Sequence, residues 1–183
     1  MPKVSQEHLE ARREQILDGA RQAFADHGYE GATVARLEEA TGLSRGAIFH
    51  YFGSKQDLFV ELAWHTNRRL GDILLERGLD DAVRAIAAES PAWLGVLIEA
   101  QTKLRHDPEF MRKMEIREAE SSRLLGWFDE RQADGSLRSD IPSAELGRYA
   151  TAVINGLALR VVAHDPFDIE AFVRLLNDAL APR

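Results

Sequence analysis

The chain has 183 residues, of which 45% are apolar and 29% charged, and its formal net charge is −7. This composition is typical of a folded protein with one or two hydrophobic cores and excludes a disordered or fibrous one. The absence of cysteine excludes disulfides, cysteine-based zinc sites and cysteine nucleophiles.

The distribution of apolar residues and charge also bears on location and partners. No apolar run reaches the ~18–20 residues that span a bilayer, and the first residues lack the apolar segment of a secretory signal. We therefore expect a cytoplasmic protein without a membrane partner. A net negative charge does not exclude DNA binding, because phosphate contacts need only a local cluster of basic groups and helix N-termini.

Apolar residues recur at helical spacing along nearly the whole chain and predict an all-α fold of about nine helices. No alternating strand pattern, internal repeat or low-complexity segment is present. We expect Gly28 to end the first helix, a looser region between Gly71 and Gly78, and a loop over 133–143. The expected helices cover approximately residues 10–26, 33–41, 44–51, 55–70, 79–90, 91–106, 109–132, 143–163 and 166–180.

The segment from Thr33 to Lys55 contains two short helices joined by a turn at Gly42, a pattern that predicts a helix-turn-helix. The second helix of such a pair enters the major groove with its N-terminal residues toward the bases. Here that end carries Ser44 as a cap, Arg45, which can bond guanine with two parallel hydrogen bonds, and the small Gly46.

The remaining residues of this segment favour contacts with the DNA backbone. Phe49 can touch a thymine methyl group, and His50 and Tyr51 can bond phosphates. Lys55 and Thr33 each begin a helix, where free N–H groups attract a phosphate. No acidic residue occurs between positions 44 and 55. A plain helical core is the alternative explanation, and it accounts for Ile48 and Phe52 but not for the three successive bulky side chains at positions 49–51.

The stretch "ILDGARQAFADHGYEGATVARLEEATGLSRGAIFHYFGSKQDLF", which covers 16–59, resembles the DNA-binding region of the tetracycline-repressor (TetR) family. The resemblance implies a homodimer with an all-helical ligand-binding body, whose last two helices build the dimer. Many members have Tyr where this chain has Phe49, so apolar contact should replace a phosphate contact there. The residues at family DNA-contact positions are Thr33, Ser44, Arg45, Gly46, Phe49, His50, Tyr51 and Lys55.

Two segments resemble a narrower group, the actinobacterial aconitase repressors, which sense a citrate–magnesium complex. These segments are "RLEEATGLSRGAIFHYF" and "KLRHDPEF". No citrate-binding residue is assigned to this chain from that resemblance, so the identity of the ligand stays open.

The last two expected helices each carry a broad apolar face and favour a four-helix dimer interface. The alternative is that these faces complete the core of the subunit itself. A two-fold dimer would place two recognition helices one turn of DNA apart and predicts a palindromic operator. The expected interface residues are Leu146, Tyr149, Val153, Leu157, Ile169, Phe172, Val173 and Leu176.

The body also contains polar and aromatic residues that could line a ligand pocket. Each of them has an ordinary structural explanation as a salt bridge, cap or core aromatic. The candidates are Trp93, Glu99, Arg105, Phe110, Arg117, Trp127, Asn155 and Arg160. The motif "HDPFD" at 164–168 has two explanations, a metal site or a helix start with Asp165 as cap and Pro166 at the first position. The helix start is the simpler one, and no metal or cofactor is expected.

These features predict a helix-turn-helix DNA-binding domain over 1–55 and a helical ligand-binding and dimerisation domain over 56–183. The expected function is a homodimeric repressor that binds a double-stranded DNA operator and is released by a small-molecule effector of unknown identity. The alternative is a DNA-binding regulator without such a ligand, controlled by a protein partner or constitutive. An enzyme is not expected, because the sequence shows no pattern typical of a nucleophile–base pair or a metal cluster.

Overall fold

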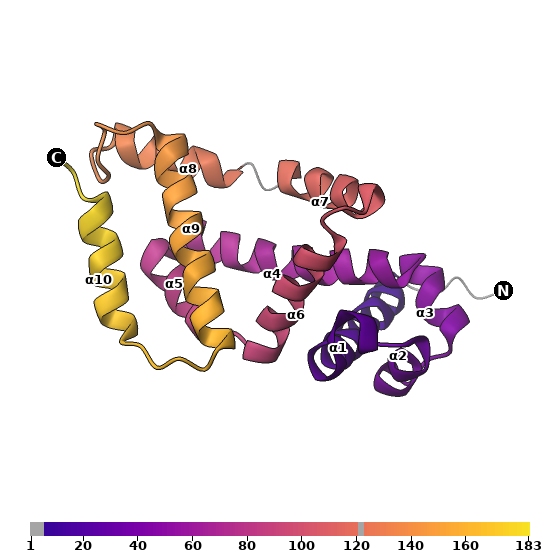
Figure 1. The fold of residues 1–183 in the computed structure, drawn as a ribbon. Coiled ribbons are helices and arrows are strands. Elements are labelled where there is room, and N and C mark those ends of the chain that lie inside the picture. The colour runs from indigo at the N-terminus through magenta and orange to yellow at the C-terminus, as the bar shows by residue number, and fades with distance from the viewer. Residues whose placement is uncertain (1–5, 121–122) are drawn as a thin grey trace. The chain divides into compact units, whose positions relative to one another are not determined.

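The computed structural model describes residues 6–120 and 123–183. These ranges contain ten α-helices and no strand (Figure 1). The all-α prediction is therefore confirmed, with one helix more than expected, because the helix expected over 109–132 is described as two. The helices are α1 (Gln6–Gly31), α2 (Val34–Thr41), α3 (Arg45–Phe52), α4 (Lys55–Arg77), α5 (Leu79–Ala87), α6 (Pro91–Leu104), α7 (Pro108–Glu120), α8 (Arg123–Ala133), α9 (Ser143–Val162) and α10 (Ile169–Leu180).

Gly28 interrupts α1 where the sequence predicts a helix end, since its φ of 72° and ψ of 172° are not helical, and α1 resumes beyond it to Gly31. Two other expected helix boundaries were wrong. Helix α4 runs through Gly71 without interruption. Helix α10 begins after Asp168, whose carboxylate accepts the N–H groups of Glu170 and Ala171, so the cap is not Asp165.

The chain divides into two compact units, which are described separately. The first unit comprises residues 1–65 and 95–113, and the second comprises 66–94 and 114–183. The helix-turn-helix expected over 1–55 lies wholly in the first unit, together with the first half of α4, most of α6 and the start of α7.

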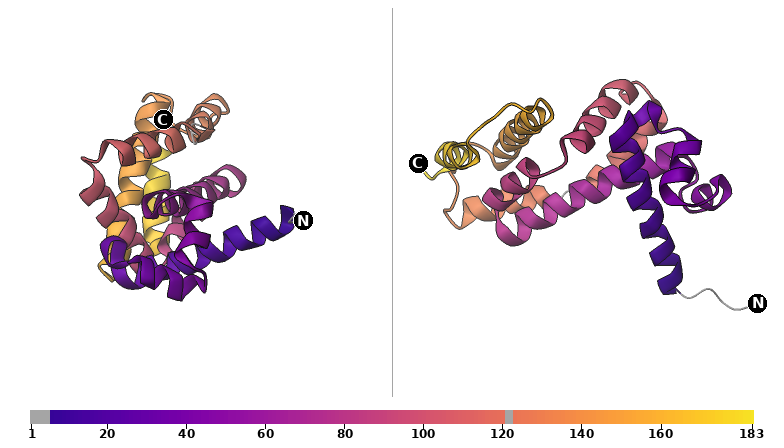
Figure 2. Two further views of the ribbon diagram at one scale, coloured as in Figure 1. Left: turned by 90° about the vertical axis from the view of Figure 1, so that its right-hand side faces the viewer. Right: turned by 90° about the horizontal axis from the view of Figure 1, so that it is seen from below.

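In the first unit, α1, α2 and α3 pack closely together (Figures 1 and 2). Gly19 makes this possible, because a Cβ there would lie 2.7 Å from the carbonyl oxygen of Ala40. The core also contains three aromatic rings that contact one another edge-on or stacked, with centroids 5.0–5.9 Å apart. These rings belong to Phe24, Tyr29 and Phe59.

In the second unit, the end of α4 and helices α5, α8, α9 and α10 share one hydrophobic core. Helices α9 and α10 lie side by side (Figures 1 and 2). Arg84 of α5 joins this helix to α10 through two hydrogen bonds of 2.9 Å to Glu170. None of the helices in the described ranges is long and apolar enough to cross a bilayer.

Candidate nucleic-acid interface

The α2–turn–α3 segment has the geometry that the sequence predicts for a helix-turn-helix. Gly42 ends α2 in the left-handed conformation, with a φ of 69°, and its N–H donates to the carbonyl oxygen of Glu38. Ser44 then starts α3 by accepting the N–H of Ala47 at 3.4 Å. Thr33 starts α2 in the same way, since its hydroxyl accepts the N–H of Arg36. The turn between the helices is therefore fixed by local hydrogen bonds.

Helix α3 has one buried face and one exposed face. Ile48 and Phe52 are buried in the core of the first unit, as their spacing predicts. Ser44, Arg45, Gly46 and His50 are exposed, and Phe49 and Tyr51 are half-buried. A Cβ at Gly46 would have no atom within 4 Å, so the start of α3 presents an open backbone surface. This face therefore offers a cation, a bare backbone and an imidazole together.

Lys55 occupies a different position from the one expected for a phosphate-binding side chain. Its ammonium donates to the carbonyl oxygens of Tyr29, at 2.8 Å, and Glu30, and it lies 4.7 Å from the Tyr29 ring centre. Burial lowers the pKa of Lys55, with Glu30 opposing the effect. The side chain thus holds the end of α1 against the start of α4, and only the backbone of Lys55 points to a role at a helix N-terminus.

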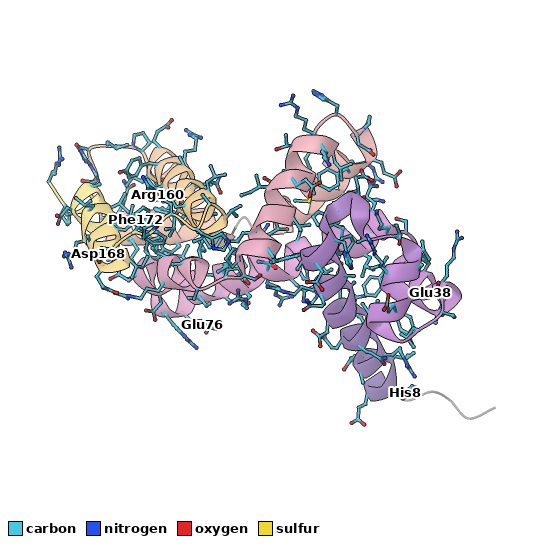
Figure 3. The ribbon with its side chains drawn as sticks, turned by 60° about the horizontal axis from the view of Figure 1, so that its bottom comes forward. His8, Glu38, Glu76, Arg160, Asp168 and Phe172 are labelled. Atoms are coloured by element: carbon cyan, nitrogen blue, oxygen red, sulfur yellow. The ribbon has the colours of Figure 1, made fainter. Side chains whose placement is uncertain are left out.

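Glu38 is a polar residue at this face that sequence reasoning missed. Its carboxylate accepts the backbone N–H of Arg45 at 2.6 Å, and Figure 3 labels it on the α2–α3 pair. Residues 44–55 include no acidic residue, but in the folded protein the Glu38 carboxylate lies against the start of this segment. The residue lies seven positions before Arg45, and no local pattern predicts a side-chain bond across the turn.

A network of charged groups joins the start of α7 to the start of α4 within the first unit. Lys113 pairs with Asp57 at 2.6 Å and with Glu109 at 2.7 Å, and Gln56 donates to Asp107 at 3.1 Å. Burial alone would raise the pKa of Asp57, but hydrogen bonds from Lys113 and Ser54 outweigh it and lower the pKa. The segment after α6 is thus tied to the first turn of α4.

The residues predicted to line a ligand pocket divide between the two units. Glu99, Arg105 and Phe110 belong to the first unit, whereas Trp93, Trp127, Asn155 and Arg160 belong to the second. The side chain of Arg117 lies outside the described ones.

Most of these residues have ordinary structural roles. Trp93 is buried and donates to the Thr66 hydroxyl at 3.0 Å, and Phe110 is also buried. Glu99 pairs with Lys103, and Arg160 pairs with Asp165. Arg105 donates to the neighbouring His106, and Asn155 is exposed on α9.

Trp127 differs from the other candidates. Its side chain is buried in the core of the second unit, yet its indole N–H has no acceptor among the described residues. Buried polar groups nearly always have a partner, and leaving one unmet costs roughly 1–3 kcal/mol. Trp127 is therefore the candidate with an unsatisfied buried hydrogen-bond donor.

The residues predicted for the dimer interface divide between the core and the surface of the second unit. Leu146, Leu157, Val173 and Leu176 are buried in the subunit's own core and have no surface to offer, so the own-core explanation applies to them. Val153, Ile169 and Phe172 are half-buried, and Tyr149 is 46% exposed.

Two further leucines on the same helices, which the sequence prediction did not include, are exposed. Leu159 of α9 is 54% exposed and Leu175 of α10 is 70% exposed. Figure 3 labels Arg160 on α9 and Phe172 on α10. Large apolar side chains therefore remain exposed on both α9 and α10.

A cavity of about 410 Å³ lies in the second unit at the start of α9 and the end of α10. Its lining includes Leu146, Tyr149, Arg138 and Arg183. The guanidinium of Arg138 is already occupied by Asp140 and by the carbonyl oxygen of Ala179. No group of three or more His, Cys, Asp or Glu side chains that could hold a metal ion occurs in the part of the chain that the structure describes.

Comparisons with known proteins agree with this geometry. Residues 16–62 match the family model for bacterial regulatory proteins of the tetR family. The HTH-type transcriptional repressor Rv1474c of Mycobacterium tuberculosis is 41% identical, over 98% of each chain. The HTH-type transcriptional repressor AcnR of Corynebacterium diphtheriae is 38% identical, over 98% of this chain and 97% of its own. The similarity thus extends well beyond the two segments noted in the sequence.

A solved structure shows the same fold. Salmonella enterica GusR superposes with a TM-score of 0.76 at 19% identity, over 97% of this chain and 96% of its own.

Proposed function

Because this chain belongs to the TetR family of bacterial regulatory proteins and is a DNA-binding transcriptional repressor, we propose that it works as a ligand-released homodimer on a palindromic operator. It is not an enzyme, since its relatives are repressors. We place its action in the cytoplasm, where its DNA target lies. The observation that carries the proposal is the exposed start of α3, with Arg45 and Gly46 side by side.

Helix α3 reads the operator. Arg45 forms no ion pair with any described residue, so its five donors are available to a guanine edge. His50 and Tyr51 of α3 and Thr33 at the start of α2 contact phosphates, and Phe49 makes apolar contact. Lys55 contributes through its backbone N–H at the start of α4 rather than through its ammonium, which is held by the end of α1.

The dimer forms through the exposed surfaces of α9 and α10. Tyr149, Leu159 and Leu175 are the large apolar residues that each leave more than a third of their area in water there. Gly156 lies between Tyr149 and Leu159, and a Cβ at this glycine would have no neighbour within 4 Å, so a partner helix can approach closely. Half-buried Val153 and Phe172 flank this surface. Burial of these groups against a second copy supplies the hydrophobic free energy of association.

The effector binds in the second unit and uses the indole N–H of Trp127. The indole N–H lies among apolar side chains. The effector is therefore a largely apolar molecule that carries one hydrogen-bond acceptor for this N–H. Helix α4 provides the physical link to DNA, because Leu58 and Phe59 are buried in the first unit and Leu74 in the second. A ligand that binds one position of α4 better shifts the population toward it.

Selection of duplexes from a random library with the purified protein tests the operator proposal. The expected result is an enriched inverted repeat with two half-sites about one helical turn apart. Enrichment of a single half-site would contradict the two-fold dimer.

A thermal-shift screen tests the effector proposal, using citrate with magnesium, acyl-CoAs and apolar carboxylic acids. The expected effector raises the melting temperature and also releases the selected duplex. If no compound does both, the repressor is controlled by a protein partner or binds constitutively.

A further inference from the structure

An acidic side chain lies at the start of α3, the helix that we propose reads the operator. Glu38 projects from α2 and accepts the N–H of Arg45 at 2.6 Å. Ser44 accepts the N–H of Ala47 in the same turn. Two of the first-turn donors of α3 therefore already have acceptors within the protein, and one acceptor carries a full negative charge.

This placement changes the electrostatics of the helix start. A helix N-terminus carries about half a positive elementary charge and attracts anions. The Glu38 carboxylate opposes that charge at the backbone N–H of Arg45. A phosphate brought to the same point, with its full negative charge, meets stronger repulsion from Glu38 than a guanine edge, which carries only partial negative charges.

We propose that Glu38 is a specificity-determining residue, which holds the start of α3 in position and discourages phosphate contacts there. The proposal rests on the function proposed above, in which α3 reads the operator. In the specific complex the start of α3 faces base edges, so the carboxylate costs little. In a non-specific complex phosphate contacts supply nearly all the affinity. Glu38 therefore penalises the non-specific complex more and widens the ratio between operator and other DNA.

Glu38→Gln separates charge from geometry, because the amide oxygen can still accept the N–H of Arg45. Glu39→Gln is the matched control, since it removes the same charge from an adjacent, exposed position of α2 with no bond to α3 among the described contacts. Glu38→Ala removes both the charge and the bond.

Fluorescence anisotropy with the selected operator duplex and a scrambled duplex of equal length measures both affinities across a salt series. From the size of one charge at a helix end, Glu38→Gln should tighten the scrambled duplex about two- to fivefold and the operator less, so that their ratio falls. Glu39→Gln should leave the ratio unchanged. Glu38→Ala should also weaken operator binding and speed hydrogen exchange at the Arg45 amide.

Equal tightening of both duplexes by Glu38→Gln, or an equal fall of the ratio in Glu39→Gln, overturns the inference. If Arg45→Ala binds the operator as tightly as the wild type, the α3 interface itself is wrong. That failure is distinguishable from a failure of the Glu38 proposal alone, in which Arg45→Ala weakens binding while the Glu38→Gln ratio stays unchanged.

Discussion

The carboxylate of Glu38 lies 2.6 Å from the backbone nitrogen of Arg45 and joins α2 to the first turn of α3. The same residue uses its backbone carbonyl oxygen to accept the N–H of Gly42, which closes the end of α2 at 2.9 Å. One residue thus fixes both sides of the turn. The direction in which Arg45 leaves the protein surface depends on this pair of bonds.

Replacing Arg45 with alanine should weaken operator binding and relax the preference for one base. The expected loss is about 1–3 kcal/mol, which is the size of a bidentate contact to guanine. Mobility-shift titrations of the operator and of its single-base variants measure both effects. Arg148→Ala removes the same charge from α9 and should leave binding unchanged; a similar loss there would point to a general charge effect.

Replacing Gly46 with alanine should stabilise the protein and weaken its binding to DNA. No atom lies within 4 Å of the new Cβ, so the gain in helix propensity, up to about 1 kcal/mol, meets no steric cost in the free protein. The methyl group would instead obstruct the close approach of DNA. Thermal melts and anisotropy titrations measure the two effects, and unchanged operator affinity would remove Gly46 from the interface.

Gly19→Ala provides the opposite case in α1. Its Cβ would meet the backbone of Ala40 and Thr41 at 2.7–2.9 Å. The variant should lose roughly 1–3 kcal/mol of unfolding free energy, because α1 and α2 must move apart. Chemical denaturation checks this value, and a stability equal to that of the wild type would contradict the close packing.

Replacing Leu175 with arginine should produce a monomer that binds the operator weakly. The side chain is 70% exposed in one subunit, so the charge does not disturb the subunit core but must be desolvated in the proposed interface. Analytical ultracentrifugation measures the mass, and circular dichroism checks the fold. Leu9→Arg, at a leucine that is 39% exposed on α1, is the control and should remain dimeric.

Asp57→Asn should lower the melting temperature at neutral pH, and the difference from the wild type should shrink in acid. The pKa of Asp57 is lower in the folded protein than in the unfolded chain, since bonds from Lys113 and Ser54 outweigh burial. Its contribution is therefore present above the unfolded value of about 3.9 and is lost as pH falls below it. For a partly exposed pair we expect about 0.5–1 kcal/mol.

Thermal melts at a series of pH values, from neutral pH to below the pKa of Asp57 in the unfolded chain, test this expectation. Asp178→Asn, at an exposed position of α10, is the control. A difference between Asp57→Asn and the wild type that persists unchanged in acid would show that the ion pair with Lys113 does not contribute.

Replacing Trp127 with phenylalanine should leave the free protein nearly as stable but weaken effector binding. The variant loses some packing and also loses a buried donor that has no acceptor, and these effects of roughly 1–3 kcal/mol oppose each other. Trp93→Phe is the contrast, because it breaks the bond to Thr66 and should lower stability. Melting curves and effector titrations distinguish the two; a large loss of stability in Trp127→Phe would favour a purely structural role.

The sequence by itself determined the fold class, the helix-turn-helix and the family, because these depend on local patterns. Helical spacing of apolar residues, the caps Thr33 and Ser44, and the turn at Gly42 act within a few residues of one another. The burial of Ile48 and Phe52 follows from the same periodicity.

Only the tertiary structure decided how the charged and apolar groups are used. It turned the Lys55 ammonium to the end of α1 and brought Glu38 to the start of α3. It also buried Leu157 and Leu176 in the subunit core while leaving Leu159 and Leu175 exposed. The contacts of Lys55 and Glu38 and the burial of these leucines depend on which face of each helix packs against a neighbouring helix. The packing partners are distant in the sequence, so a local sequence pattern does not specify them.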